Sequence, residues 1–271
     1  MTQGFERTVR NGVTYYAVPF LEQAAPVRAA FATRLGGVST GETATMNLSF
    51  SRKDTPENVR ENYRRVGAAA GFPLKGLAVS RQVHGAHVLE VRQAHVGRGV
   101  FDDDNSPEAD GLMTDQLGVA LVKHSADCVS IYLVDRARPA IALLHAGWRG
   151  TAARIAQEGL RRMAEVYGTR PENCLAAIGP SIGPCCFQVG PDVSAVFEES
   201  FPGWGLVSGD RVDLWECNRR QLQEMGVPPE NICVAGLCTA CDTDTFFSHR
   251  AERGKTGAMA AFLMLLERSI A

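Results

Sequence analysis

Three short segments carry residue types that suit a metal ion, and each of them stands at the end of a strand-like run. The segments are QVHG (82–85), SADC (125–128) and HAGWRG (145–150). They contribute His84, Cys128 and His145, and two imidazoles with one thiolate are a donor set that suits zinc. Three protein ligands leave a fourth position open for water or substrate, as a catalytic site requires. Because the three residues lie far apart in sequence, the alternative is that they are ordinary polar residues at strand ends.

The same residues also fit a nucleophilic pair, with Cys128 as the thiolate and His145 as its base. The two interpretations compete for one sulfur, since a thiolate bound to zinc is a poor free nucleophile. A measurement of bound metal separates them.

Arg149 follows His145 at a predicted strand-to-helix junction, GWRGT (147–151). Unpaired N–H groups at a helix start attract anions, and a guanidinium adds a planar cation. The junction therefore predicts a phosphate or carboxylate site, although it is too short for a P-loop and lacks the lysine of one. The alternative is that Arg149 is a surface residue and the glycines only make the turn.

The chain has eight Cys, and most of them have no evident chemical task. Cys238 and Cys241 form a CxxC, but a structural zinc would want a second such pair, which we do not find at a usable spacing, so buried structural thiols are favoured. Cys185 and Cys186 lie in a tight turn beside a candidate cleft. Three further Cys are expected in the core, and three His show no evident partner: Cys174, Cys217, Cys233, His87, His95 and His124.

Strands and helices mix along the chain without strict alternation, which predicts an α/β or α+β fold with mixed sheets in one domain over residues 1–271. The acidic run at 101–110 is expected to be a solvated loop. Expected strands lie at 78–92 and 118–134 (both interrupted), 141–146, 174–179, 231–239, 245–250 and 258–266. Expected helices lie at 151–167, 191–200 and 212–225, the first capped by Thr151 or Gly150 and ended by Gly168.

Composition excludes several classes of protein. Lys and Arg number 28 against 30 Asp and Glu, so there is no basic field for nucleic acid or an anionic membrane. The longest apolar stretch, 257–266, is about half of the ~20 residues that a membrane span needs. We see no secretory signal in the first residues, and the thiols are expected to be reduced in a cytoplasmic protein.

Several motifs stand in one order that resembles the bacterial YfiH-type, laccase-domain family, also called polyphenol oxidase or peptidoglycan editing factor. The similarity extends from about residue 30 to residue 266. The most specific motifs are HAGWRGT and GPSIGPCC. The others are residues 30–50, QVHG, ADGLMTD (109–115), ADC and CTACDTDTFFSHR (238–250).

The resemblance implies a four-layer α/β/β/α fold and one zinc ion per chain held by His84, Cys128 and His145, which would be the catalytic residues. It implies phosphorolysis of purine nucleosides (adenosine, inosine and methylthioadenosine), accompanied by adenosine deamination. Candidate holders of the phosphate are then Arg149, Arg34 and Arg250. Asp127 is a modest candidate for the acid that protonates ammonia, because it would point away from Cys128 on a strand.

Two other activities remain as alternatives. One is a Cys128/His145 amidohydrolase that edits cell-wall precursors, and the other is a copper-linked polyphenol oxidase side activity with Cu²⁺ in place of zinc. A multicopper oxidase needs more imidazoles than the six His here, partly as His-x-His pairs, and the chain has no such pair. A true laccase is therefore excluded on ligand count.

Overall fold

Alternating burial along the central strands builds two sheets that share one apolar layer. In the computed structural model, which describes residues 4–98 and 106–267, β3 (Val27–Ala32) directs Phe31 to one side and Ala30 to the other. β8 (Val129–Asp135) divides Tyr132 and Ile131 in the same way. Phe31 and Tyr132 meet in the layer between the sheets, so successive side chains of each strand serve two different cores.

The first sheet has six strands in the order β1-β2-β3-β14-β7-β4. Four of its pairings are antiparallel, and β4 joins β7 in parallel. Besides β3, its strands are β1 (Glu6–Arg10), β2 (Val13–Ala17), β14 (Met259–Leu265), β7 (Ala120–Ser125) and β4 (Leu77–Ala78).

The second sheet also has six strands, in the order β13-β10-β8-β9-β6-β5, with parallel pairs at both edges. Besides β8, its strands are β13 (Ile232–Val234), β10 (Cys174–Ile178), β9 (Ala140–Ala146), β6 (Gly111–Thr114) and β5 (Val88–Glu90). A small antiparallel ribbon pairs β11 (Val207–Ser208) with β12 (Arg211–Val212). Both large sheets are therefore mixed, as the sequence predicts.

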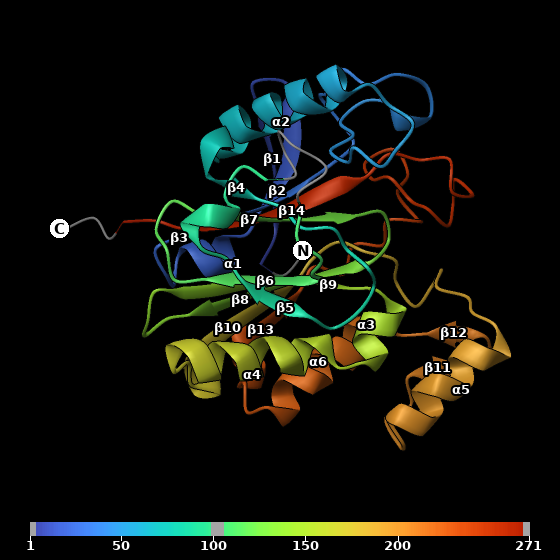
Figure 1. Ribbon diagram of the computed structural model, residues 1–271. Helices are drawn as coiled ribbons and strands as arrows, with labels where there is room; N and C mark the ends of the chain where they lie inside the picture. The colour runs from blue at the N-terminus through green and yellow to red at the C-terminus, as the bar shows by residue number, and fades with distance from the viewer. Residues whose placement is uncertain (1–3, 99–105, 268–271) are drawn as a thin grey trace.

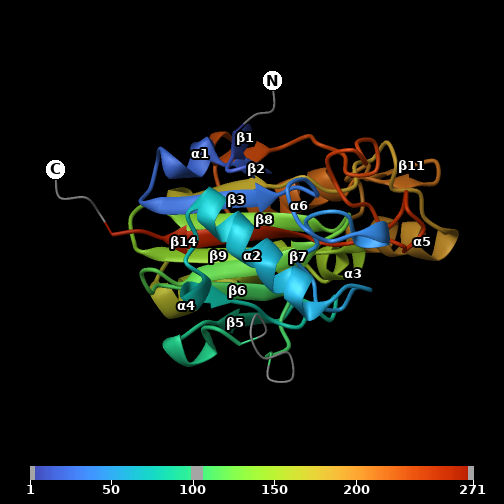
Figure 2. The same cartoon turned by 90° about the horizontal axis from the view of Figure 1, so that it is seen from above.

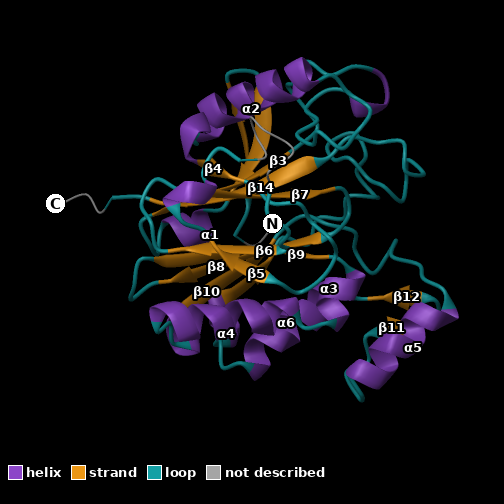
Figure 3. Cartoon of the chain, viewed as in Figure 1, coloured by secondary structure: helices purple, strands orange, loops and turns teal. Residues whose placement is uncertain are grey.

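Helices cover the outer face of each sheet, which gives four layers, α/β/β/α (Figures 1 and 3). α2 (Pro56–Ala70) packs on the first sheet and runs across it in Figure 2. α4 (Ile155–Tyr167) and α6 (Leu214–Glu224) pack on the second sheet. α5 (Pro191–Ser200) lies beside the β11–β12 ribbon, and the short α1 (Pro19–Glu22) borders β3.

The helix expected over 151–167 is two helices. α3 (Trp148–Ala152) begins after Gly147, not at Gly150 or Thr151, and α4 begins after Arg154. Arg154 has a positive φ of 61°, and this left-handed residue breaks the helical hydrogen bonding. Its guanidinium bonds to the carbonyl of Ser200 at 2.9 Å and stacks over Phe201. Tertiary contacts thus hold a break that the periodic pattern of apolar residues does not reveal. Gly168 ends α4 as expected, with φ 67°.

Most other expected elements are present, the strand expected over 231–239 is only the short β13 (Ile232–Val234), and one expected strand is wrong. The strands expected at 141–146, 174–179 and 258–266 are β9, β10 and β14, and the other two expected helices are α5 and α6. Residues 245–250 form turns rather than a strand, because the N–H groups of Thr245 and Phe246 bond back to Asp242. No helix among residues 4–98 and 106–267 has the length and apolar character to cross a bilayer.

Candidate active site

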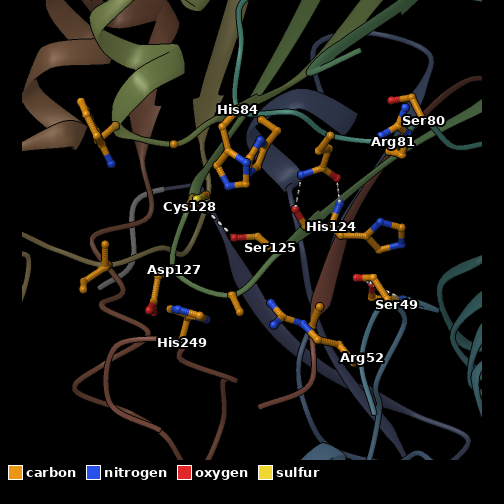
Figure 4. Close-up of a pocket in the computed structure, with 18 of the residues that line it drawn as sticks. Ser49, Arg52, Ser80, Arg81, His84, His124, Ser125, Asp127, Cys128 and His249 are labelled. Carbon is orange, nitrogen blue, oxygen red and sulfur yellow. Dashed lines mark hydrogen bonds between the residues drawn. The ribbon is translucent and has the colours of Figure 1, made fainter. Parts of the chain in front are cut away.

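His84, Cys128 and His145 come together at one end of the two sheets, and their ligand atoms lie within 4.8 Å of one another. His84 belongs to the loop between β4 and β5, Cys128 to the turn between β7 and β8, and His145 to β9. Figure 4 shows His84 and Cys128 facing the same open space. The structure therefore brings together the three residues that the sequence singles out as a metal-binding set.

Asp110 organises this group, although the sequence places it in a loop expected to be solvated. Its side chain is fully buried and accepts a hydrogen bond from His145 Nδ1 at 2.9 Å. It also accepts the backbone N–H groups of Val83, His84 and Gly85 at 3.2, 3.0 and 2.8 Å. One carboxylate thus fixes the ring of one ligand and the backbone of another, while residues 101–105 lie outside the described residues.

The protonation states around Asp110 suit a metal ligand. Burial raises the pKa of Asp110, but the hydrogen bonds from His145 and the backbone outweigh it and bring the pKa to about 2. Burial lowers the pKa of His145 in spite of the carboxylate beside it. A neutral imidazole that donates its Nδ1–H to Asp110 has a lone pair on Nε2, the atom left for a metal.

The turn that precedes Cys128 fixes the position of its backbone. Asp127 has a φ of 91°, and Ser125 Oγ donates to the carbonyl of Cys128 at 2.5 Å. Burial, followed by the charges of Asp127 and Asp110, raises the pKa of the Cys128 thiol to about 12. Such a thiol is not an activated nucleophile by itself, whereas a bound metal ion would hold it as the thiolate.

The space around the three ligands fits a small ion. A Cβ atom on Gly147 would lie 3.0 Å from Cys128 Sγ and 3.2 Å from the Cδ2 atom of His84. Any side chain at this position would therefore press on two ligands. The two imidazoles, the thiol and the space between them could hold a metal ion.

His84, Cys128 and His145 line part of a cavity of about 760 Å³ at this end of the two sheets. One part of its wall is apolar and includes Phe187, Ile182 and Leu214. Polar groups stand among further apolar ones in the rest of the lining, and they supply hydroxyl, imidazole and guanidinium groups: Ser49, Ser51, Arg52, Ser80, Arg81, Ser125, His124, His249 and Arg250. A cavity of this size with a few convergent polar groups is typical of a small-molecule site.

Arg52 is a cavity residue that sequence reasoning missed. It lies in a Ser-rich segment before α2, where no motif marks it, and its Nε is buried with no hydrogen-bond partner among the described residues. Burial lowers the pKa of Arg52, with the charges of Cys128 and Asp127 acting in the opposite direction. A buried guanidinium donor without a partner is costly unless an anion or water binds it.

The three arginines that the sequence proposes for phosphate lie in different places. Arg250 lines the cavity, and its Nη1 donates to the carbonyl of Gln188 at 2.6 Å. Arg149 is exposed, does not line the cavity and stacks on Trp148 at 4.2 Å. Arg34 also lies outside the cavity lining, and bonds to Ala44, Thr243 and Glu252 occupy its guanidinium. Only Arg250 of the three therefore reaches the cavity.

Two imidazoles of the cavity wall lie outside the ligand group. His124 Nε2 is 2.6 Å from the hydroxyl of Tyr63, so it does have a partner, contrary to expectation, and burial lowers its pKa to about 4. His249 is exposed on the wall (Figure 4). Asp127 also borders the cavity, but Thr239 Oγ1 donates to one of its oxygens at 2.6 Å and the Arg250 N–H to the other at 2.7 Å.

Comparison with known proteins shows which family has this sequence. The family described as "Multi-copper polyphenol oxidoreductase laccase" matches residues 28–266. The chain belongs to this laccase-domain family. Among its relatives is the purine nucleoside phosphorylase YlmD of Geobacillus stearothermophilus, 38% identical over 96% of each chain. The purine nucleoside phosphorylase YfiH of Escherichia coli is 34% identical over 92% of this chain and 98% of its own.

Solved structures of the laccase-domain family share the fold. The crystal structure of YlmD from Geobacillus stearothermophilus superposes with a TM-score of 0.90 at 36% identity, covering 97% of this chain and 99% of that one. The mixed α/β architecture expected from the family resemblance is thus confirmed. The relatives' names support a purine nucleoside phosphorylase-like function, with nucleosides and phosphate as the substrates that such a function implies.

Proposed function

We propose that the protein is a zinc-dependent purine nucleoside phosphorylase that acts on adenosine, inosine and methylthioadenosine and also deaminates adenosine. The observation that carries the proposal is the ligand group of His84, Cys128 and His145, which opens on a cavity containing a buried, unpartnered Arg52 donor. The names of the relatives support the reaction class.

The cavity lining offers side chains for both parts of the reaction's substrates. The apolar wall at Phe187 and Ile182 offers a surface for the flat purine, because aromatic and aliphatic side chains favour apolar rings. Arg52 and Arg250 are the cavity guanidiniums that we assign to phosphate, since their planar donors match its oxygens. Arg149 and Arg34, which lie outside the lining, take no part in this assignment.

Phosphorolysis forms a bond between a phosphate oxygen and ribose C1′ and breaks the bond between C1′ and purine N9. The electron pair of the broken bond goes to the base, which must gain a proton to leave as a neutral purine. His249 is the group we assign to deliver this proton, because the other imidazole outside the ligand group, His124, is neutral and engaged with Tyr63.

Deamination exchanges the amino group at purine C6 for a water-derived oxygen and releases ammonia. When bound, zinc would supply Lewis acidity at its open position and lower the pKa of water there. His84, Cys128 and His145 would hold the ion, and Asp110 would keep the His145 ring oriented. Asp127 has both oxygens engaged, so we assign it the positioning of Arg250 rather than proton transfer.

Copper and the amidohydrolase alternative receive less support. A Cys128 thiol with a pKa raised to about 12 needs a metal to become a thiolate, which disfavours a free Cys128/His145 nucleophile. The family's name refers to several coppers, but the chain has only six His.

The deciding experiment incubates the zinc-loaded full chain with each nucleoside, with and without phosphate. We expect free base and ribose 1-phosphate only when phosphate is present, and inosine from adenosine in either case. Release of free ribose, or no product with any nucleoside, would overturn the assignment.

The metal's part is tested by Cys128→Ser, which removes the single sulfur of the ligand group. We expect loss of zinc from this site and loss of both activities. Cys174→Ala, in the buried core on β10, is the matched control and should retain both. Full turnover by a Cys128→Ser protein lacking zinc at this site would falsify the role of the ion.

A further inference from the structure

Four other thiols form a second cluster, which shares no residue with the ligand group of His84, Cys128 and His145. The sulfur atoms of Cys185, Cys186, Cys238 and Cys241 lie within 4.8 Å of one another. Cys241 Sγ is 3.6 Å from Cys185 Sγ and 3.4 Å from Cys186 Sγ. The CxxC therefore does have a second pair, which the sequence hides because it is two adjacent residues.

Backbone pairing brings the two pairs together. The N–H of Ser181 donates to the carbonyl of Leu237 at 3.1 Å, and the N–H of Thr239 donates to the carbonyl of Ser181 at 3.1 Å. Each pair then lies in a tight turn, closed by the Cys186 N–H on Gly183 and by the Cys241 N–H on Cys238. The two turns thus face each other and bring their sulfur atoms together. The sequence predicts buried structural thiols for the CxxC, and this prediction is wrong, because Cys241 is exposed and Cys238 only half-buried.

The geometry suits a tetrahedral ion. Four sulfurs at about 2.3 Å from a central zinc are about 3.8 Å apart, and the observed separations have this size. All four thiols are free. The Gly183 N–H donates to Cys238 Sγ at 3.2 Å, and such donors favour a thiolate.

We propose that Cys185, Cys186, Cys238 and Cys241 form a second, structural zinc site with four thiolate ligands. On binding, the four thiol protons pass to water and four Zn–S bonds form, with no change of oxidation state. Four protein ligands leave no open position, so this site holds structure and performs no chemistry. The proposal is independent of the phosphorylase assignment.

The two turns that carry the four thiols also contribute to the cavity wall and to the contacts of Asp127. Ile182 and Phe187, on either side of the first turn, line the cavity. Thr239, between the two Cys of the CxxC, donates to Asp127, which precedes the ligand Cys128. An ion that ties the two turns together would therefore hold one wall of the cavity against the first metal site.

The first test is metal content of the full chain purified under reducing conditions, measured by mass spectrometry of the elements. We expect two zinc ions per chain in the wild type and in Cys174→Ala, and one in Cys128→Ser, in Cys238→Ser and in Cys241→Ser. One zinc in the wild type that is lost in Cys128→Ser overturns the proposal, as does iron with sulfide in place of the second zinc.

The second test remains valid if the cluster variants fail to fold. Cobalt is exchanged for zinc in the Cys128→Ser protein, which keeps all four thiols of the cluster. We expect the strong sulfur-to-cobalt absorption and the visible bands of a tetrahedral four-thiolate site. After chelation and denaturation, seven free thiols should react in this variant. Absence of those bands, or fewer reactive thiols because disulfides have formed, contradicts the zinc site.

Discussion

Asp110 orients two residues of the proposed metal-binding group, although it is not among the residues that line the cavity. It holds the ring of His145 and three consecutive backbone N–H groups around His84, so its removal would free two of the three ligands at once. Carboxylates that orient a ligating imidazole are worth a large part of the affinity of such sites.

We therefore predict that Asp110→Asn lowers zinc affinity at the His84 group by about 10- to 100-fold, because an amide cannot accept all four donors as a carboxylate does. Competition with a chromophoric chelator measures the loss. Glu108→Gln is the control, since Glu108 is exposed and pairs with Arg81 and, through its backbone, with His87. Equal zinc affinity in the two variants would show that Asp110 does not organise the site.

Arg52 carries the next prediction. If its unpartnered donor binds phosphate, Arg52→Gln should raise KM for phosphate at least about tenfold, which is ~1.4 kcal/mol of lost binding, and leave KM for inosine nearly unchanged. Arg149→Gln makes the same chemical change outside the cavity lining and should alter neither constant. A larger change in KM for inosine than for phosphate would assign Arg52 to the nucleoside instead.

At the scale of elements, the junction between β9 and α3 matters most, because Gly147 leaves the space in which the ligands meet. A methyl group there would lie 3.0 Å from Cys128 Sγ and 3.2 Å from His84 Cδ2, so it would displace atoms of two ligands. We predict that Gly147→Ala weakens zinc binding and activity while the thermal unfolding midpoint of the metal-free protein changes little. A large loss of metal-free stability with normal zinc affinity would contradict this.

The secondary-structure elements also show which parts of the fold and of the site could be predicted from the sequence. Strands β9, β10 and β14 are continuous apolar runs, which the sequence shows directly. The three ligands stand in recognisable motifs, with His145 near the end of β9, Cys128 just before β8 and His84 before β5. Asp110 is hidden because acidic residues precede it, whereas its burial depends on donors from residues 83–85. Pairing across the fold is also what brings Cys185 and Cys238 together, and no local pattern encodes it.

At the scale of the whole molecule, the two sheets enclose an ionisable group. Lys123 on β7 alternates with Val122, so it points with Leu121 into the layer between the sheets, where it is fully buried. Its amine donates to the carbonyl of Ala109 at 2.6 Å and to the hydroxyl of Ser80. The bond to Ala109 crosses from the first sheet to the segment that leads into β6 of the second, whereas Ser80 follows β4 of the first sheet.

Lys123 should therefore make stability depend on pH. Burial lowers its pKa from the ordinary value of 10.5 to about 7, although the charge of Asp110 acts the other way. Between these values the unfolded chain holds a proton that the folded chain has lost. The free energy of unfolding then rises with pH across this window, by at most about 1.4 kcal/mol per pH unit.

Lys123→Met removes the titrating amine while keeping a side chain of similar length, so we predict that it flattens this rise. Urea unfolding of both proteins at pH 7, 8 and 9 measures the slopes, and their difference isolates Lys123 from other titrating groups. Lys75→Met, at an exposed position, should keep the wild-type slope. If Lys123→Met kept the same slope as well, the amine would have to be charged in the folded protein throughout this range, and its neutralisation between the two sheets would be wrong.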